Sequence, residues 1–414
     1  MNRPPRIADT GLGGAEPQPP AGAGVTELPI PADLPSSVSL FTFPNRILFG
    51  RGSRRLLGVE LARLGCVRPL VVTDAGLMAA GVVAEATAGI REPVLFCEVH
   101  ANPTEENVLA GLECYRDSRC DGIVGLGGGS PIDAAKAIRL LVSHPGPLVD
   151  YALSQGGSDK IEPTMPPMIA VPTTAGTGSE AGRGALIQFS ELGRKAIVRS
   201  PHLLPSVAVC DPDLTRGLSP ELTAGTGMDA LSHCIESFLA KGFHPICDGI
   251  AVEGLRSIFQ GLETAVRDGA NMEARGSLML GALLGGISFH KGLGVVHALS
   301  HALGSEGRVH HGTLNAILLP HALRFNREAA EARMGELAAR VGLGRGGDGP
   351  GHLVTLAELV LARMPLPRRL GELSGLRKDR IADYARLAML DHCQLTNPRP
   401  CSASELEDLL ERAW

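Results

Sequence analysis

The sequence predicts an α/β N-terminal domain with a doubly wound, mostly parallel sheet, followed by an all-α C-terminal domain. First, short apolar runs alternate with helix-like segments between residues 40 and 210, which is typical of parallel sheets covered by helices. Second, the alternation stops near residue 220, after which apolar residues recur at helical spacing. Third, the length of 414 residues exceeds one ordinary domain.

Three regions are therefore expected. Residues 1–36 contain glycine-rich and proline-rich pieces without apolar periodicity, so they cannot offset the entropy cost of ordering and are expected to form a disordered tail. Residues 37–218 are expected to form the α/β domain. Residues 219–414 are expected to form the helical domain, with the junction near residues 217–220.

The individual elements follow from apolar periodicity and from turn and cap residues. Strands are expected at residues 41–43, 47–49, 69–73, 94–99, 122–126, 168–171, 184–189, 195–199 and 206–210. Helices are expected at residues 54–64, 82–89, 104–117, 221–225, 230–240, 248–265, 271–289, 294–303, 315–324, 329–341 and 353–364. Thr104 with Asn107, and Ser402 with Glu405, have the spacing of helix caps, the second opening a helix that runs to Trp414.

Composition excludes several classes of protein. A net charge of −5 with 3% aromatic residues gives neither a basic stripe nor a stacking platform, so we expect no nucleic-acid partner. No apolar run reaches the length needed to span a bilayer, and no apolar stretch follows Arg3 and Arg6, so neither a membrane partner nor a secretory signal is expected. Nine irregularly spaced cysteines suit a reducing compartment. We expect a soluble, cytoplasmic protein.

A glycine-rich turn follows the strand at residues 122–126. It consists of Gly127, Gly128, Gly129 and Ser130, followed by Pro131, Ile132 and Asp133, and it leads into a helix through residues 134–137. Glycines let the backbone approach a diphosphate, and the helix N-terminus offers free amide donors. This is not the G-x-G-x-x-G fingerprint, and an ordinary tight turn would look similar. The turn is a moderate indication of a dinucleotide site.

Two further strand ends carry polar residues. The strand at 168–171 leads into a loop that contains Thr173, Thr174, Thr177 and Ser179, and loops at the carboxyl ends of parallel strands face one ligand crevice. Asp74 ends the strand at 69–73. An acidic residue there can bind the ribose hydroxyls and would repel a 2′-phosphate, which favours NAD over NADP, although an ordinary turn aspartate is the alternative.

Histidines and one aspartate recur at helical spacing in the predicted helical domain. Asp229 and His233 are four residues apart, as are His297 and His301, and His311 follows ten residues after His301. Residues four apart share a helix face. A carboxylate with three neutral imidazoles suits a divalent transition metal, so we predict ligation by Asp229, His233, His297 and His311. A single histidine on an apolar helix is more often a core residue, but two such pairs make that reading weaker.

The motifs around these residues resemble a known family. Residues 211–215, Pro220 and residues 224–236 resemble the first signature of the iron-containing (group III) alcohol dehydrogenases, which belong to the dehydroquinate synthase-like superfamily. Residues 292–301, with His311 and Gly312 placed fourteen residues after His297, resemble the second. The resemblance extends from about Phe41 to the end of the chain.

The resemblance implies an activity and a cofactor site. It implies a metal-dependent, NAD(P)-linked alcohol dehydrogenase or aldehyde reductase that transfers hydride between nicotinamide C4 and a metal-bound alcohol or carbonyl. The metal would be Fe(II), with Zn(II) as an alternative. The residues implied to lie around the cofactor are Gly127, Gly128, Gly129, Ser130, Asp133, Thr173, Thr174, Thr177, Ser179 and, near the ribose, Lys195. His301 lies one turn beyond His297, so we predict proton transfer rather than metal ligation for it.

A dehydroquinate synthase-like or glycerol dehydrogenase-like enzyme of the same superfamily would also carry the glycine turn, and a metal-dependent hydrolase would use the metal without the dinucleotide. We expect a homodimer or higher homo-oligomer with a small alcohol or aldehyde as substrate. Arg183 and Gly184 depart from the hydroxyl-bearing pattern of better-known members, which leaves the particular alcohol open.

Overall fold

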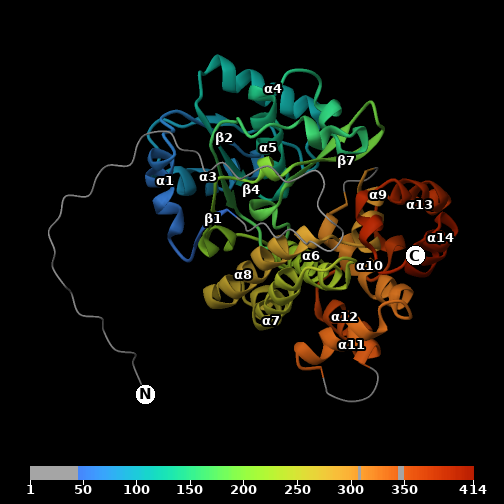
Figure 1. Cartoon of the computed structure of the whole chain (residues 1–414). Helices are drawn as coiled ribbons and strands as arrows, with labels where there is room; N and C mark the ends of the chain where they lie inside the picture. The colour runs from blue at the N-terminus through green and yellow to red at the C-terminus, as the bar shows by residue number, and fades with distance from the viewer. Residues whose placement is uncertain (1–44, 306–308, 344–348) are drawn as a thin grey trace, which may run out of the picture. The chain divides into compact units, whose positions relative to one another are not determined.

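A six-stranded parallel sheet organises the first half of the chain in the computed structural model (Figure 1). The strand order is β1 (Arg46–Phe49), β8 (Val207–Cys210), β5 (Met168–Pro172), β4 (Gly122–Gly127), β2 (Pro69–Val72) and β3 (Val94–Phe96), and every neighbouring pair is parallel. The structure describes residues 45–305, 309–343 and 349–414, so the expected tail at 1–36 and the expected strand at 41–43 lie outside the described residues.

Both faces of the sheet are buried, because successive strand residues point in opposite directions. Val71 and Val124 pack in one core with α1 (Leu57–Arg63) and α3 (Val82–Thr87). Their neighbours Leu70 and Ile123 pack in the other core with α4 (Glu105–Asp117) and α5 (Gly129–Ser143). The strands therefore read as continuous apolar runs, and the doubly wound prediction is confirmed.

Smaller elements complete this half. The two runs expected at 184–189 and 195–199 pair as an antiparallel hairpin, β6 (Gly184–Phe189) and β7 (Arg194–Arg199). A short helix after β2, α2 (Ala75–Ala79), was not predicted. The capping box formed by Thr104 and Asn107 is confirmed at the start of α4.

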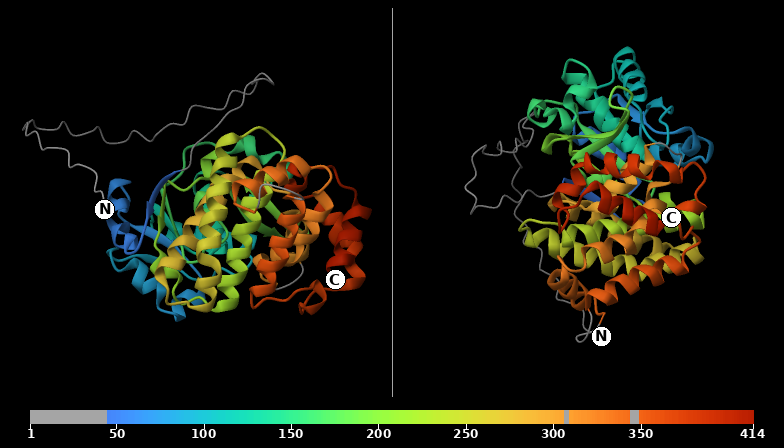
Figure 2. Two further views of the ribbon diagram at one scale, coloured as in Figure 1. Left: turned by 90° about the horizontal axis from the view of Figure 1, so that it is seen from below. Right: turned by 90° about the vertical axis from the view of Figure 1, so that its right-hand side faces the viewer.

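The second half is helical, and residues 211–305, 309–343 and 349–414 contain no strand. Figure 2 shows its helices in yellow to red. They are α6 (Pro220–Leu239), α7 (Pro245–Arg267), α8 (Met272–Ser288), α9 (Val295–Gly304), α10 (His311–Asn326), α11 (Glu331–Arg340), α12 (Gly349–Arg363), α13 (Ile381–Met389) and α14 (Ala403–Ala413). Apolar side chains of all nine helices share one core. Helix α13 was not predicted, whereas the capping box of Ser402 and Glu405 is confirmed.

Helix α6 is continuous and joins the two helical segments expected at 221–225 and 230–240. Its glycines serve close packing instead of ending the helix. A Cβ at Gly225 would lie 2.7 Å from Nδ1 of His310, and a Cβ at Gly227 would lie 2.4 Å from Cδ1 of Leu262. Tertiary contacts thus offset the low helix propensity of glycine. The consequence is that Asp229 and His233 lie in the middle of one unbroken helix.

The loop after β5 approaches the helical half very closely at two glycines. A Cβ at Gly178 would lie 2.3 Å from Cα of Gly286 in α8, and Gly178 has a φ of +64°. A Cβ at Gly176 would lie 2.7 Å from Cβ of Thr226 in α6. Both glycines are therefore required for this close approach. The contact sets the loop directly against α8 and against α6, which carries Asp229 and His233.

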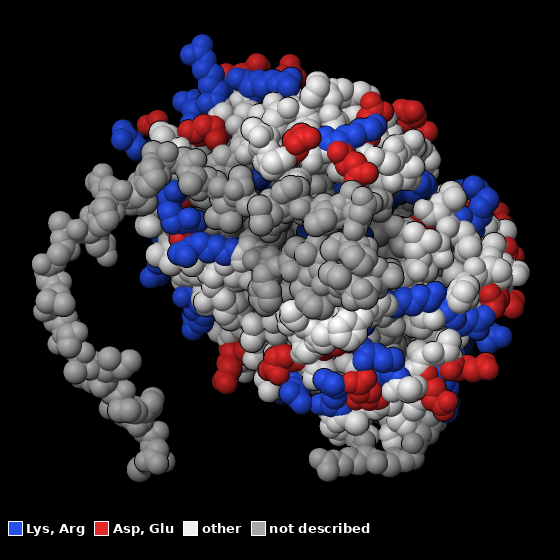
Figure 3. Space-filling model, in the orientation of Figure 1, with Lys and Arg blue, Asp and Glu red and all other residues white. Residues whose placement is uncertain are grey.

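In Figure 3, basic and acidic side chains are interspersed over the coloured part of the face that is drawn. Among the described residues, no single helix is long and apolar enough to cross a membrane. The segments Met272–Lys291 and Val295–Gly304 satisfy that test together, but they are bent by 105° at the break between them.

The close contact of Gly178 with Gly286 predicts a large difference between two glycines of α8. A Cβ at Gly286 would lie 2.6 Å from Cα of Gly178, whereas a Cβ at Gly276 would lie 3.9 Å from its nearest atom, Cγ of Pro212. Gly286→Ala should lower the free energy of unfolding by about 1–3 kcal/mol through overpacking. Gly276→Ala should leave it unchanged or raise it by about 0.4–1 kcal/mol. Urea unfolding measures both, and equal stability of the two variants would contradict the contact.

Candidate functional site

Three helices bring the four candidate metal ligands together. Helix α6 carries Asp229 and His233 one turn apart, α9 carries His297, and α10 begins at His311. Asp229, His233 and His297 are buried. The close approach of α10 to α6 requires Gly312, since a Cβ there would lie 2.1 Å from the carbonyl oxygen of Gly225.

The distances within this cluster fit a divalent cation. Oδ1 of Asp229 lies 3.5 Å from Nε2 of His297, 3.6 Å from Nε2 of His311 and 3.7 Å from Nε2 of His233. Metal bonds of about 2.1 Å at tetrahedral angles would place ligand atoms about 3.4 Å apart. Ligand atoms of Asp229, His297 and His311 all lie within 4.8 Å of one another. Asp229, His297 and His311 therefore have the chemistry and the mutual spacing of a metal site, and Nε2 of His233 lies beside them, 3.7 Å from Oδ1 of Asp229.

The protonation states of three ligands also suit a cation. Although burial opposes its ionisation, nearby His233 and His311 hold the pKa of Asp229 well below its usual value. Burial lowers the pKa of His233 to about 4 and places that of His311 well below its usual value. The site thus offers an ionised carboxylate and neutral imidazoles, which are the forms that bind metals.

Glu236 fixes the orientation of His297, and this residue was missed in the sequence. Its Oε2 lies 2.6 Å from Nδ1 of His297, and its Oε1 accepts a hydrogen bond of 2.8 Å from the backbone amide of Val296. Although burial opposes the charged imidazole, bonds to Asp229 and Glu236 raise the pKa of His297 to about 9. A proton on Nδ1 leaves Nε2 facing the cluster. Glu236 lies seven residues after Asp229, on the same face of α6, and this spacing could have identified it from the sequence.

His301 lies beside the cluster, as its position one turn after His297 predicted. Its ring stacks on that of His311 with centroids 5.3 Å apart. Its Nδ1 lies 2.9 Å from Oδ2 of Asp391, which precedes the 3₁₀ helix His392–Thr396. Although burial opposes ionisation, His301 lowers the pKa of Asp391. The carboxylate orients the imidazole from one side and leaves Nε2 on the other. Asp391 was not identified from the sequence.

On the sheet side, the glycine turn and the loop after β5 lie against each other. Helix α5 begins at Gly129, inside the turn and earlier than expected. A Cβ at Gly129 would lie 3.0 Å from Cγ2 of Thr177, and a Cβ at Gly128 would lie 3.4 Å from Cγ2 of Thr174. The amide of Thr173 donates a 2.9 Å hydrogen bond to the carbonyl of Gly127. The two candidate cofactor loops therefore form one surface at the N-terminus of α5.

Asp133 and Ser179 contact each other and a buried lysine. Ser179 Oγ donates a 2.5 Å hydrogen bond to Asp133 Oδ1, and Lys136 Nζ donates to Ser179 Oγ at 2.9 Å and to the carbonyl of Gly184 at 2.8 Å. The other oxygen of Asp133 accepts from the amide of Leu186. Lys136 has no exposed surface, and burial lowers its pKa. These polar groups tie α5, the loop after β5 and the β6–β7 hairpin together.

The remaining candidate cofactor residues surround this surface. Asp74 caps α2 by accepting a 2.9 Å hydrogen bond from the amide of Leu77, at the end of β2, which pairs with β4. Ser130 Oγ donates to the carbonyl of Ala101. Lys195 Nζ donates to Oδ1 of Asn102 at 2.7 Å, and burial lowers the pKa of Lys195 to about 8. Because β2 and β4 are neighbouring parallel strands, Asp74 and the glycine turn both lie at the carboxyl end of the sheet.

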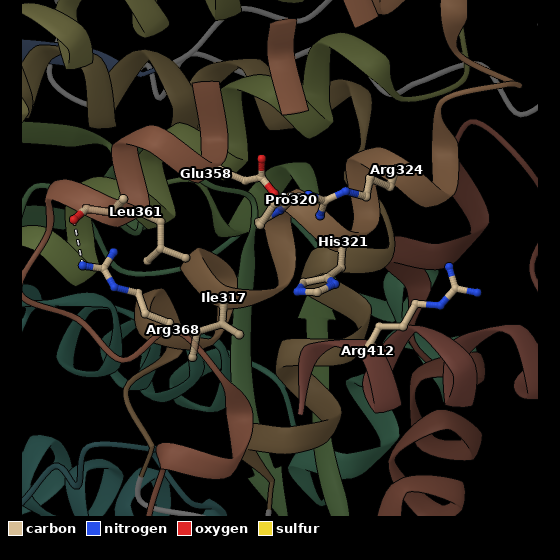
Figure 4. A pocket seen from close by; sticks show the side chains of 9 residues that line it. Ile317, Pro320, His321, Arg324, Glu358, Leu361, Arg368 and Arg412 are labelled. Carbon is tan, nitrogen blue, oxygen red and sulfur yellow. Dashed lines mark hydrogen bonds and ion pairs between the residues drawn. The ribbon is translucent and has the colours of Figure 1, made fainter. Parts of the chain in front are cut away.

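A separate hollow of about 440 Å³ lies elsewhere on the helical half (Figure 4). Its lining comprises Ile317, Pro320, His321, Arg324, Glu358, Leu361, Ala362, Arg368 and Arg412. The lining includes none of the candidate metal or cofactor residues. Size alone therefore does not identify the chemical site, which is recognised by its donor atoms.

The structure combines a parallel sheet that has a glycine turn at a helix N-terminus with a buried carboxylate and three imidazoles. This combination defines a dinucleotide-dependent metalloenzyme. The comparisons with known proteins agree with this class. Residues 44–212 match the family model for iron-containing alcohol dehydrogenase, and residues 223–414 match the C-terminal model of the same family. The chain belongs to the iron-containing alcohol dehydrogenase family.

Individual relatives cover nearly the whole chain. The 4-hydroxybutyrate dehydrogenase of Cupriavidus necator is 44% identical over 87% of this chain and 96% of its own length. The 1,3-propanediol dehydrogenase of Citrobacter freundii is 35% identical over 90% of this chain and 98% of its own length. The chain is an oxidoreductase acting on CH–OH groups, a metal-dependent, NAD-linked alcohol dehydrogenase or aldehyde reductase.

Solved structures share the fold. The crystal structure of a 1,3-propanediol oxidoreductase aligns with a TM-score of 0.86 and 34% identity, and covers 91% of this chain and 100% of that one. The sulfoacetaldehyde reductase from Bifidobacterium kashiwanohense, solved in complex with NAD+, aligns with a TM-score of 0.81 and 29% identity over 91% of this chain and 99% of that one. These comparisons support NAD and a metal as cofactors, iron being typical of the family.

The raised pKa of His297 predicts proton release on metal binding. At pH 7.5 the metal-free imidazole, with a pKa of about 9, holds a second proton that a metal must displace from Nε2. Binding of Zn(II) to metal-stripped enzyme should therefore release about one proton from His297, and this release should vanish as the pH rises through 9. Titration calorimetry in buffers of different ionisation enthalpy measures the number of protons released.

Glu236→Gln provides the comparison. Loss of the Glu236 charge should lower the pKa of His297, so that fewer protons are released at pH 7.5. Equal release from the variant and the unaltered enzyme would contradict the role assigned to Glu236.

Proposed function

We propose that this enzyme interconverts a short hydroxy acid and the corresponding aldehyde acid, with NAD as hydride carrier and Fe(II) as metal. The observation that supports this substrate class most directly is a pair of cationic side chains on the β6–β7 hairpin beside the metal cluster. The 44% identity to a 4-hydroxybutyrate dehydrogenase points to the same class.

Successive residues of strand β7 point alternately into the hydrophobic core and away from it. Ala196 and Val198 of β7 are buried in the core beneath the sheet, and Lys195, Ile197 and Arg199 point to the other side, where they are half-buried. The charge of Lys195 acts on His311, and the charge of Arg199 acts on His290 and His392. Strand β7 therefore carries one cation toward the metal ligands and a second toward the segments next to them.

Arg199 is suited to a carboxylate. Among the described residues the ion pairs of Asp and Glu are formed with other cationic side chains, and none involves Arg199. A guanidinium binds a carboxylate through two parallel hydrogen bonds, which fixes orientation as well as charge. A hydroxy acid bound in this way would direct its alcohol end toward the ligand cluster.

Separate groups of residues would hold the metal and the dinucleotide. Asp229, His233, His297 and His311 would hold the metal, which when bound supplies a Lewis acid that polarises the substrate oxygen. The glycine turn and Thr173, Thr174 and Thr177 would hold the dinucleotide, whose nicotinamide carries the hydride. Asp133 and Ser179 would act on the cofactor by fixing the loops.

His301 would transfer the alcohol proton. Asp391 holds Nδ1 of His301, so Nε2 is the atom that can accept a proton from the substrate side during oxidation and return it during reduction. The bond to the carboxylate also stabilises the imidazolium that forms.

Asp74, at the end of β2, supports a preference for NAD, and NADP would meet repulsion between its 2′-phosphate and this carboxylate. Zn(II) is the alternative metal, since the same donor set accepts it. Lys195 would lie near the ribose while its charge also reaches the substrate side. We further propose a cytoplasmic homodimer or higher homo-oligomer, with a division into an α/β domain at 37–218 and a helical domain at 219–414.

The substrate class is tested by comparing 4-hydroxybutyrate with 1-butanol. Arg199→Gln should lower kcat/KM for 4-hydroxybutyrate by about 10- to 100-fold, the effect of one hydrogen bond to a charged group, and should leave kcat/KM for 1-butanol unchanged. Initial rates of NADH formation give both values. Equal losses for the two substrates, or no preference for the acid in the unaltered enzyme, would refute carboxylate recognition while leaving alcohol oxidation intact.

The proton-transfer role of His301 gives a separate prediction. His301→Ala should retain its metal, measured by elemental analysis, while kcat for alcohol oxidation falls on the order of 10²-fold. The acidic limb of the pH profile of kcat should flatten, because the group that must lose its proton is gone. Loss of metal in parallel with activity would instead assign His301 to support of the ligands.

A further inference from the structure

A fifth polar side chain lies inside the ligand cluster. Asn315 is on α10, one turn after His311, and has no exposed surface. Its Nδ2 donates a 2.7 Å hydrogen bond to Oδ1 of Asp229 and lies 3.2 Å from Nε2 of His297 and 3.1 Å from Nε2 of His311. One amide nitrogen thus contacts the same three atoms that are placed to bind the cation.

The other end of this amide is unsatisfied. Within the described part of the chain, Oδ1 of Asn315 is buried and has no hydrogen-bond partner. Buried amide oxygens almost always have a partner, so an orphaned oxygen next to a metal-binding cluster requires an explanation. The unmatched acceptor and the crowded donor belong to one planar group, and a half-turn of that group exchanges their places.

We propose that Asn315 is a member of the metal centre with two roles. In the metal-free protein one amide hydrogen is donated to Asp229 and the other faces Nε2 of His311, which holds α6 and the start of α10 together and preforms this part of the site. With the cation present, the positive end of an N–H bond would point at a positive charge, so the amide turns and directs Oδ1 to the metal. A neutral amide oxygen is an accepted ligand for hard and borderline divalent cations. This inference rests on the ligand set described above, because it assigns an additional residue to the same site.

A simpler role makes the opposite prediction for one substitution. If Asn315 acted only by donating to Asp229, a carboxylate in its place would repel that aspartate and weaken metal binding more than alanine would. If Oδ1 faces the cation, a carboxylate supplies an oxygen at the same place with added negative charge, and binding is preserved or strengthened. Asn315→Asp and Asn315→Ala therefore separate the two roles.

The experiment measures metal affinity without substrate or NAD. Metal-stripped enzyme is titrated with Zn(II) or Co(II) against a chromophoric chelator, which gives the Kd for the metal. Asn315→Ala should raise the Kd by about 10- to 100-fold, the usual effect of removing a supporting group at a metal site. Asn315→Asp should have a Kd equal to or below that of the unaltered enzyme, and the visible spectrum of bound Co(II) should differ between Asn315→Ala and the unaltered enzyme.

Two control variants make the result specific. Asn326→Ala removes another buried asparagine from α10, one that bonds to Asn397 at 2.9 Å, and it should leave the metal Kd unchanged. His297→Ala should weaken binding strongly, and if it does not, the ligand set itself is wrong. An unchanged Kd in Asn315→Ala alongside weak binding in His297→Ala would overturn only the proposal for Asn315. A Kd for Asn315→Asp above that for Asn315→Ala would overturn the ligand role.

Discussion

The buried carboxylate of Asp229 is the constraint on which the helical half depends. An ionised group at 2% exposure is tolerated only when it is paired or coordinates a metal. Burial holds the imidazoles of His233 and His311 neutral, whereas the pKa of His297 is raised to about 9, so His297 is the charged partner in the metal-free protein. Three helices therefore converge on one oxygen atom, and a particular structural feature of each helix makes this possible. Unbroken α6 supplies the oxygen, Glu236 orients the ring from α9, and Gly312 lets the start of α10 approach.

The sheet half has a comparable centre in Lys136. Its buried ammonium bonds to Ser179 and to the carbonyl of Gly184, and Ser179 in turn bonds to Asp133. A half-satisfied network at this depth would be costly, whereas a satisfied one specifies a single arrangement of the surrounding loops. The geometry of the glycine turn is thus maintained by the polar groups packed against it. Asp133 and Ser179, which the family resemblance places near the cofactor, belong to this supporting network.

The periodic features of the chain were predictable, and the long-range contacts were not. Apolar periodicity located the sheet, the hairpin and most helices. The four-residue intervals selected Asp229 with His233 and His297 with His301, because helical residues so spaced share a face, and His311 was added as a third imidazole. Glu236 and Asp391 escaped notice because their partners His297 and His301 lie 61 and 90 residues away. Asn315 lies one turn after His311, but its bond to Asp229 spans 86 residues. The continuity of α6 also depends on long-range contacts, because its glycines pack against residues that are distant in sequence, His310 and Leu262.

The contact between Gly178 and Gly286 has a consequence for how this protein can change over evolution. When a large residue meets a small one, enlarging the small partner can be compensated by trimming the large one. Here both partners already lack a side chain, and their backbones are the atoms that meet. No second substitution at either position can relieve a first one at the other. The two positions therefore cannot change one at a time, and variation where the loop after β5 meets α8 must arise at residues around these two glycines.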